Sequence, residues 1–103
     1  MIEIAYHRAM NMVTIKGHAG YKEDGEDIVC AAVSTLACTL AANLSNEIVR
    51  DAIVRLDPGD TVIHAAARAR FKNVVNLIYD VIANGFEGVA EAYPKNVRFT
   101  RYE

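Results

Sequence analysis

The order of strand-like and helix-like segments is the feature that most constrains how this chain can fold. Five short segments have the pattern of β-strands, namely residues 2–7, 12–18, 52–56, 61–67 and 97–102. Two long segments have the pattern of helices, an alanine-rich one over about residues 28–46 and an amphipathic one over about residues 72–92. The order β-β-α-β-β-α-β predicts an α+β fold, a two-layer sandwich with about five strands and two helices.

Local signals set the expected boundaries of these elements. Asp27 is a good N-cap for the first helix, because its short carboxylate can accept hydrogen bonds from the first-turn amides. Residues 57–60, with the order Asp-Pro-Gly-Asp, predict a tight turn between two strands. Pro94 predicts the end of the second helix, since the residue before a proline avoids the helical conformation.

The length and composition predict one domain over residues 1–103 with a substantial apolar core. The hydrophobic fraction of 52% is high for this length, so we expect a dense core or a surface covered by a partner subunit. The formal charge of −2 provides no general excess of positive charge to hold a phosphate backbone. Direct nucleic-acid binding is therefore not expected, although a local basic patch remains compatible with the composition.

The cysteines and the apolar runs bear on location. Both cysteines fall in the first predicted helix, eight residues or about 12 Å apart, which is too far for a disulfide within that helix. Free thiols in a chain that opens on a strand pattern, without an export signal, predict a cytoplasmic protein. The apolar stretches are interrupted by polar residues, so we expect no membrane span.

The residues with most chemical potential are Cys30 and His18. Cys30 lies twelve residues after His18, near the start of the first predicted helix, and a polar loop with two glycines joins them. A helix N-terminus and a nearby imidazole both favour the reactive thiolate form of cysteine. The alternatives are a cysteine that packs as a small apolar side chain and a histidine that is merely exposed in a loop.

Neighbouring residues leave further alternatives open. Ser34 lies four residues after Cys30 and shares its helix face, where its hydroxyl could reach the site or bond a backbone carbonyl. The charge of Asp27 opposes a thiolate if it lies beside the sulfur, and assists if it engages the backbone or orients a histidine. Cys38 is expected to be inert core, and His7 and His64 to be structural.

Metal and cofactor sites are not predicted. One Cys and one His twelve residues apart do not form a structural zinc site, which uses four ligands, usually in close pairs. The acidic residues between them do not have the spacing of a calcium loop. Gly20 and Gly25 do not complete a phosphate-binding or dinucleotide-binding pattern. We therefore expect no metal and no cofactor.

Residues 17–19, the acidic glycine loop and residues 27–34 resemble the signature of the ribosomal-processing cysteine protease family, Prp, and the pair at 93–94 fits the same family. The resemblance implies an α+β homodimer that cleaves a peptide substrate. By the same resemblance, the expected substrate is the N-terminal extension of bacterial large-subunit ribosomal protein number twenty-seven. By this resemblance Cys30 is the nucleophile of an acyl-enzyme mechanism and His18 is the general base.

The resemblance also implies roles for the surrounding residues. Asp27 and Ser34 match positions that support activity. A substrate-binding and gating loop is implied by Gly17 and the residues that follow it, including Ala19, Gly20 and Gly25. Other interpretations remain: a phage or prophage member that processes a capsid or scaffold protein, and a non-catalytic dimeric protein associated with the ribosome. A buried, unreactive thiol would favour the non-catalytic interpretation.

Overall fold

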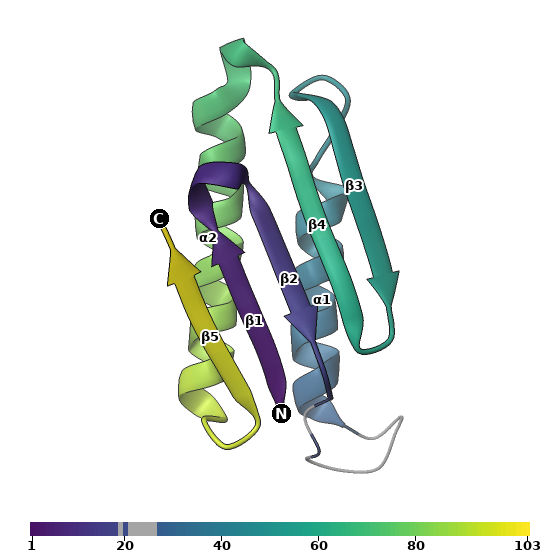
Figure 1. The fold of residues 1–103 in the computed structure, drawn as a ribbon, viewed down its shortest axis with the longest axis vertical. Helices are drawn as coiled ribbons and strands as arrows, with labels where there is room; N and C mark the ends of the chain where they lie inside the picture. The colour runs from purple at the N-terminus through teal and green to yellow at the C-terminus, as the bar shows by residue number, and fades with distance from the viewer. Residues whose placement is uncertain (19, 21–26) are drawn as a thin grey trace.

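The computed structural model describes residues 1–18, 20 and 27–103, and it contains one five-stranded sheet with two helices on one face (Figure 1). The elements follow the predicted order. Their bounds are β1 Ile2–His7, β2 Met12–Lys16, α1 Ile28–Ala42, β3 Val49–Asp57, β4 Asp60–Ala67, α2 Lys72–Ala92 and β5 Val97–Tyr102. The α+β sandwich expected from the sequence is therefore confirmed.

The sheet has the strand order β3-β4-β2-β1-β5. Three of its pairs are antiparallel, and the β1–β5 pair is parallel. Parallel neighbours need a long crossover connection, and here the chain between β1 and β5 contains both helices. This topology places β1 and β2 in the interior of the sheet and β3 at an open edge.

The core lies between the sheet and the helical layer. Alternate side chains of the central strands point into the core, as the period-two pattern predicts. Each large apolar side chain that is fully buried contributes about 1.5–3 kcal/mol to the stability of the fold. The sheet contributes Ile2, Ile4, Tyr6, Val13, Ile15, Ile63, Ala65 and Val97. The helices contribute Val29, Val33, Ala37, Leu40, Val75, Tyr79, Ile82, Ala83 and Phe86. By contrast, only the first residue of β3 is buried.

A polar network ties β1 to α2 beside this core. The hydroxyl of Tyr6 donates to Oδ1 of Asp80 at 2.7 Å, and Arg8 donates to both oxygens of that carboxylate at 3.1 Å. Burial alone would raise the pKa of Asp80, but the hydrogen bonds from Arg8 and Tyr6 outweigh it and hold that pKa below its usual value. Burial and the same carboxylate raise the pKa of Tyr6.

Several boundaries differ from the sequence-based prediction. The first helix ends at Ala42 rather than near residue 46, because Asn43 and Leu44 close it with turn hydrogen bonds to Leu40 and Ala41. The second strand ends at Lys16, so His18 follows the strand instead of ending it. β3 is longer than residues 52–56, since pairing with β4 extends it in both directions. The second helix ends at Ala92, as the Pro94 signal predicted.

The two helices of the described residues are both too short or too polar to span a membrane.

Candidate functional site

A tight backbone arrangement holds His18 in place two residues after the end of β2. Gly17 has φ +91°, and a β-carbon there would overlap the carbonyl oxygen of Met1. The amide of Gly17 donates to the carbonyl of Gly59 at 3.0 Å, and the carbonyl of His18 accepts from the amino group of Met1 at 2.6 Å. Glycine is needed at position 17 because both the positive φ and the close approach exclude a side chain.

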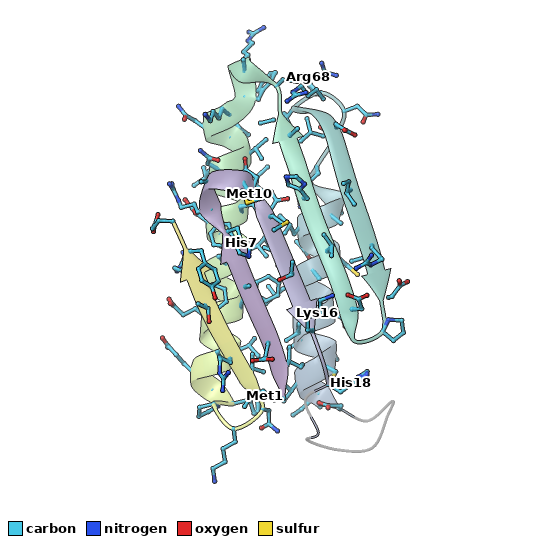
Figure 2. All side chains as sticks on the ribbon, viewed as in Figure 1. Met1, His7, Met10, Lys16, His18 and Arg68 are labelled. Carbon is cyan, nitrogen blue, oxygen red and sulfur yellow. The ribbon has the colours of Figure 1, made fainter. Side chains whose placement is uncertain are left out.

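The imidazole of His18 packs against the turn between β3 and β4. A β-carbon on Gly59, which has φ +70°, would lie 2.8 Å from Nε2 of His18. The ring therefore occupies the space that any other residue at position 59 would fill. Figure 2 shows His18 at the same end of the molecule as Lys16 and Met1.

Cys30 lies in the first turn of α1, as the sequence predicted. Asp27 is the N-cap, and its Oδ1 accepts from the amides of Val29 at 2.9 Å and Cys30 at 3.0 Å. The other carboxylate oxygen, Oδ2, accepts from the thiol of Cys30 at 3.3 Å. Both alternatives considered for Asp27 therefore occur together, because one oxygen engages the backbone and the other lies beside the sulfur.

This cap has two chemical consequences. The sulfur can donate to Oδ2 only while it carries its proton, so this contact would be lost in the thiolate. The carboxylate also uses the amides of Val29 and Cys30, and the amide of Ala31 donates to the carbonyl of Asp27 at 3.1 Å. The amides of Val29 and Cys30 can therefore bind another anion only if the Asp27 carboxylate moves, whereas the amide of Ala31 stays in the helix hydrogen-bond ladder.

A cavity of about 390 Å³ joins these groups. Its walls come from the end of β2, from one face of α1 and from the β3–β4 turn, residues 56–61. His18 and Cys30 both line it, and Ser34 lies one helical turn further along the α1 wall. His18 is exposed and Cys30 is partly buried, so the thiol is accessible from a cavity that also contains the imidazole. A sealed thiol, which would have favoured the non-catalytic interpretation, is not observed.

Cys38 corrects a prediction. The sequence placed it in the inert core, but its side chain is exposed and lines the far part of the same cavity. The physical reason is helical spacing, because Ala37 and Leu40 face the core while Cys38 lies on the stripe of α1 that also carries Cys30 and Ser34. Ala37, the preceding residue, takes the buried position instead.

The rim of the cavity is charged. Asp60 at the start of β4 pairs with Lys16 and also with Arg55, whose Nη2 lies 3.2 Å from the carboxylate. The hydrogen bond from Lys16 is the main cause that lowers the pKa of Asp60. The rim therefore carries an ionised carboxylate at neutral pH, close to the wall formed by Gly59.

Some residues of the predicted site lie outside the described part of the chain. Ala19, Gly25 and most of the loop implied to bind substrate belong to positions 19 and 21–26, which the structure does not describe. Gly20 is described and has φ +66°, with no neighbouring atom within 4 Å of the position of a β-carbon. Among the described residues, no group of three or more His, Cys, Asp or Glu side chains could hold a metal ion.

The β3–β4 turn is a part of the site that sequence patterns do not indicate. The Asp-Pro-Gly-Asp order of residues 57–60 predicts a turn, but nothing in a turn pattern indicates which other segment it will contact. Strand pairing decides this: β4 lies next to β2, so the start of β4 meets the end of β2, where His18 follows. The turn thereby becomes a wall of the site.

With this geometry, the comparison with known families is decisive. The profile of the family described as cysteine protease Prp matches residues 1–98. The chain belongs to the cysteine protease Prp family. A cysteine protease needs an accessible thiol, and the cavity described above is lined by Cys30 and also by His18.

Solved structures of Prp proteins have the same fold. One is the essential ribosomal processing protease Prp of Staphylococcus aureus with a covalently linked product peptide. It matches with a TM-score of 0.76 and 23% sequence identity, and the match covers 99% of this chain and 100% of that chain. The same protease with a substrate peptide has a TM-score of 0.69 and 19% identity over 98% of this chain and 97% of that chain.

A third similar structure is SMU.848 of Streptococcus mutans, with a TM-score of 0.69 and 27% identity over 97% of this chain and 90% of that chain. No curated protein matches the chain.

Proposed function

We propose that this protein is an endopeptidase that removes the N-terminal extension of large-subunit ribosomal protein number twenty-seven, with Cys30 as nucleophile and His18 as general base. The observation that carries the proposal is the shared cavity, which a thiol and an imidazole both line between α1 and the β3–β4 turn. The family adds support, and the S. aureus relative is a ribosomal processing protease solved with peptides.

The proposed reaction proceeds in two halves. His18 takes the proton of Cys30, and the sulfur attacks the scissile carbonyl carbon to give a tetrahedral intermediate. The C–N bond breaks as His18 returns the proton to the leaving amine, which leaves an acyl-enzyme on Cys30. His18 then takes a proton from water, the hydroxide attacks the thioester, and the thiol is restored as the extension departs as a carboxylic acid.

Asp27 controls the starting state in this mechanism. Its Oδ2 accepts a hydrogen bond from the thiol in the described structure, at 3.3 Å from the sulfur. Movement of this carboxylate would release the sulfur and also free the amides of Val29 and Cys30. We propose that substrate binding causes this movement, and that the freed amides then stabilise the oxyanion of the tetrahedral intermediate. Low activity without the correct peptide would follow.

Ser34 and the glycine loop are proposed to contact the substrate. Ser34 is exposed on the cavity side of α1, one turn from Cys30, where a peptide lying along the helix would meet its hydroxyl. Gly17 is proposed to fix His18, and the loop that contains Ala19, Gly20 and Gly25 to close over the bound peptide.

We also propose a homodimer formed by a single-domain chain of residues 1–103, located in the cytoplasm with its ribosomal substrate. An apolar stripe on α2 supports the oligomer: Val74, Leu77 and Val81 are 44%, 63% and 58% exposed. Large exposed apolar side chains that share one helix face are typical of a covered surface. Light scattering of the protein and of Leu77→Glu tests this, and a monomeric parent contradicts it.

The experiment for the activity uses a peptide that carries the ribosomal extension. Cys30→Ala and His18→Ala should each abolish cleavage, while Cys38→Ala, on the same helix and the same cavity wall, should cleave close to the parent rate. Circular dichroism must show that all three variants are folded. Cleavage by Cys30→Ala at the parent rate would refute the proposal, and loss of cleavage in Cys38→Ala alone would assign the nucleophile to the other thiol.

A further inference from the structure

Positive charge is distributed unevenly over this molecule. The structure describes ten Lys and Arg side chains, and five of them pair with a carboxylate: Arg8, Lys16, Arg55, Arg98 and Arg101. The other five make no ion pair with a described carboxylate: Arg50, Arg68, Arg70, Lys72 and Lys95. Although the overall charge is −2, these five cations are not paired with a carboxylate of the described residues.

Four of these cations gather at one end of the molecule, and we name Arg50, Arg68, Arg70 and Lys72 the basic end. Arg68 is bound at the top of the sheet by the carbonyls of the α1–β3 connection, since its Nε donates to Asn46 at 2.9 Å and its amide to Ile48 at 2.9 Å. Figure 2 shows Arg68 at the end opposite His18. All four side chains are exposed. Two acidic residues, Glu47 and Asp51, lie near them in the sequence.

The basic end is not a flat surface. A hollow of about 560 Å³ lies there, and Arg50, His64 and Lys72 line it together with Met10 and small alanine side chains. The pairing of β3 with β4 shifts its register between Val49 and Asp51, which places Arg50 at a bulge. Bulges re-aim side chains, and this one gives Arg50 a place at the hollow beside Lys72.

The chemistry of the basic end favours a phosphate backbone. Three of its four cations are arginines, whose planar guanidinium groups donate two parallel hydrogen bonds to one phosphate. The guanidinium of Arg70 also lies 5.6 Å from the centre of the Phe71 ring, within the range of a cation–π contact. A lipid surface is a less suitable partner. Among the described residues that line the hollow, only Met10 is a large exposed apolar side chain that could insert into lipid.

We propose that the basic end binds the phosphate backbone of RNA and so anchors the protein on the ribosomal particle that contains its substrate. The choice of RNA over an acidic protein segment rests on the proposed function, because ribosomal proteins are surrounded by RNA. β4 connects the two ends: it starts at Asp60 on the rim of the active-site cavity and reaches Ala67 about 23 Å away. An RNA bound at the basic end therefore leaves the cavity free for the peptide.

A direct binding measurement tests this without protease activity. The probe is a fluorescently labelled single-stranded RNA of about 20 nucleotides, followed by anisotropy between about 50 and 200 mM salt. We expect Kd in the range of about 10⁻⁶ to 10⁻⁴ M, and a slope of log K against log salt of about −3 if all four cations contact phosphates. The double variant Arg70→Ala/Lys72→Ala should bind at least about tenfold more weakly and lower the slope by about half.

A matched control separates a local site from net charge. Lys95→Ala/Arg98→Ala removes the same two charges from the α2–β5 turn and β5, and it should bind RNA as the parent does. Equal weakening by both double variants contradicts the proposal, as does absence of RNA binding at low salt. Binding to anionic vesicles or to an acidic peptide in place of RNA also contradicts it.

Cleavage of the extension peptide by the same variants distinguishes this proposal from the proposed function. Arg70→Ala/Lys72→Ala should cleave the free peptide at the parent rate, because neither residue lines the active-site cavity. Parent protein that binds RNA but does not cleave refutes the proposed function alone. Parent protein that cleaves but does not bind RNA refutes the basic end alone.

Discussion

Nε2 of His18 lies where the side chain of residue 59 would otherwise be, only 2.8 Å from the position of a β-carbon on Gly59. The imidazole can occupy this position only because residue 59 of the turn has no side chain. The proposed general base, His18, follows β2, and the proposed nucleophile, Cys30, lies in α1. The β3–β4 turn contacts the first and lines the cavity that contains both.

Gly59→Ala should displace the imidazole and lower kcat/KM for the extension peptide by roughly 10- to 100-fold, since small displacements of catalytic groups cost about two orders of magnitude per ångström. The control is Gly88→Ala in α2, which has no neighbouring atom within 4 Å and should keep full activity. The Tm of both variants is measured alongside. Parent activity in a folded Gly59→Ala protein would show that this contact does not position His18.

Asp27→Asn should separate the two functions of the N-cap. Asparagine keeps an oxygen that accepts from the helix amides, so the free energy of unfolding should change little, whereas Asp27→Ala should lose about 1 kcal/mol. Both variants remove the charge 3.3 Å from the sulfur of Cys30. Alkylation of Cys30 by iodoacetamide at neutral pH should therefore be faster in both variants than in the parent.

Mass spectrometry of each alkylated cysteine gives the rate, with Cys38 as the internal reference. An unchanged rate at Cys30 in Asp27→Asn would mean that the carboxylate does not stabilise the protonated thiol. Turnover of the peptide should nevertheless decrease, because the proposed mechanism uses Asp27 to support catalysis.

Asp80 should give the fold an acid-sensitive component. The pKa of Asp80 is lower in the folded protein than in the unfolded chain. Its contribution to the free energy of unfolding is therefore complete above the ordinary pKa of 3.8, and it is lost as the pH falls through the lower pKa of the folded state. Asp80→Asn should destabilise the protein by about 1–3 kcal/mol at neutral pH, because Tyr6 and Arg8 lose a charged partner. Urea unfolding at neutral pH and below pH 3.8 measures both effects.

In acid, the difference in unfolding free energy between parent and Asp80→Asn should shrink. A difference that is the same at both pH values would exclude the ionised carboxylate as its source. Arg8→Gln provides a second comparison, since it removes a charge from the same network without touching the carboxylate.

Lys72→Glu should raise the stability of the protein while it weakens RNA binding. Lys72 is the first residue of α2, whose first turn contains no acidic residue and whose N-cap makes no side-chain hydrogen bond. A glutamate there interacts favourably with the helix dipole and should add about 0.3–1 kcal/mol to the unfolding free energy. Thermal unfolding at low and high salt checks the sign, and a decrease in Tm at low salt would contradict the electrostatic origin.

The elements and their order could be predicted from local patterns. The period-two strands, the Asp27 cap and the Pro94 stop depend on neighbours within a few residues, and the described structure confirms each of them. The end of α1 and the length of β3 were predicted less well. Both depend on hydrogen bonds to other segments, in particular the pairing of β3 with β4, which no local pattern contains.

The candidate site divides in the same way. A thiol in the first turn of a helix and a histidine after a strand follow from the order of residues, because capping and alternation act over short distances. Three other features depend on which strands become neighbours in the sheet. They are the contact of His18 with Gly59, the exposure of Cys38 and the clustering of four cations at one end. Such contacts join residues that are far apart in the chain, and they exist only after the sheet has assembled and the helices have packed on it.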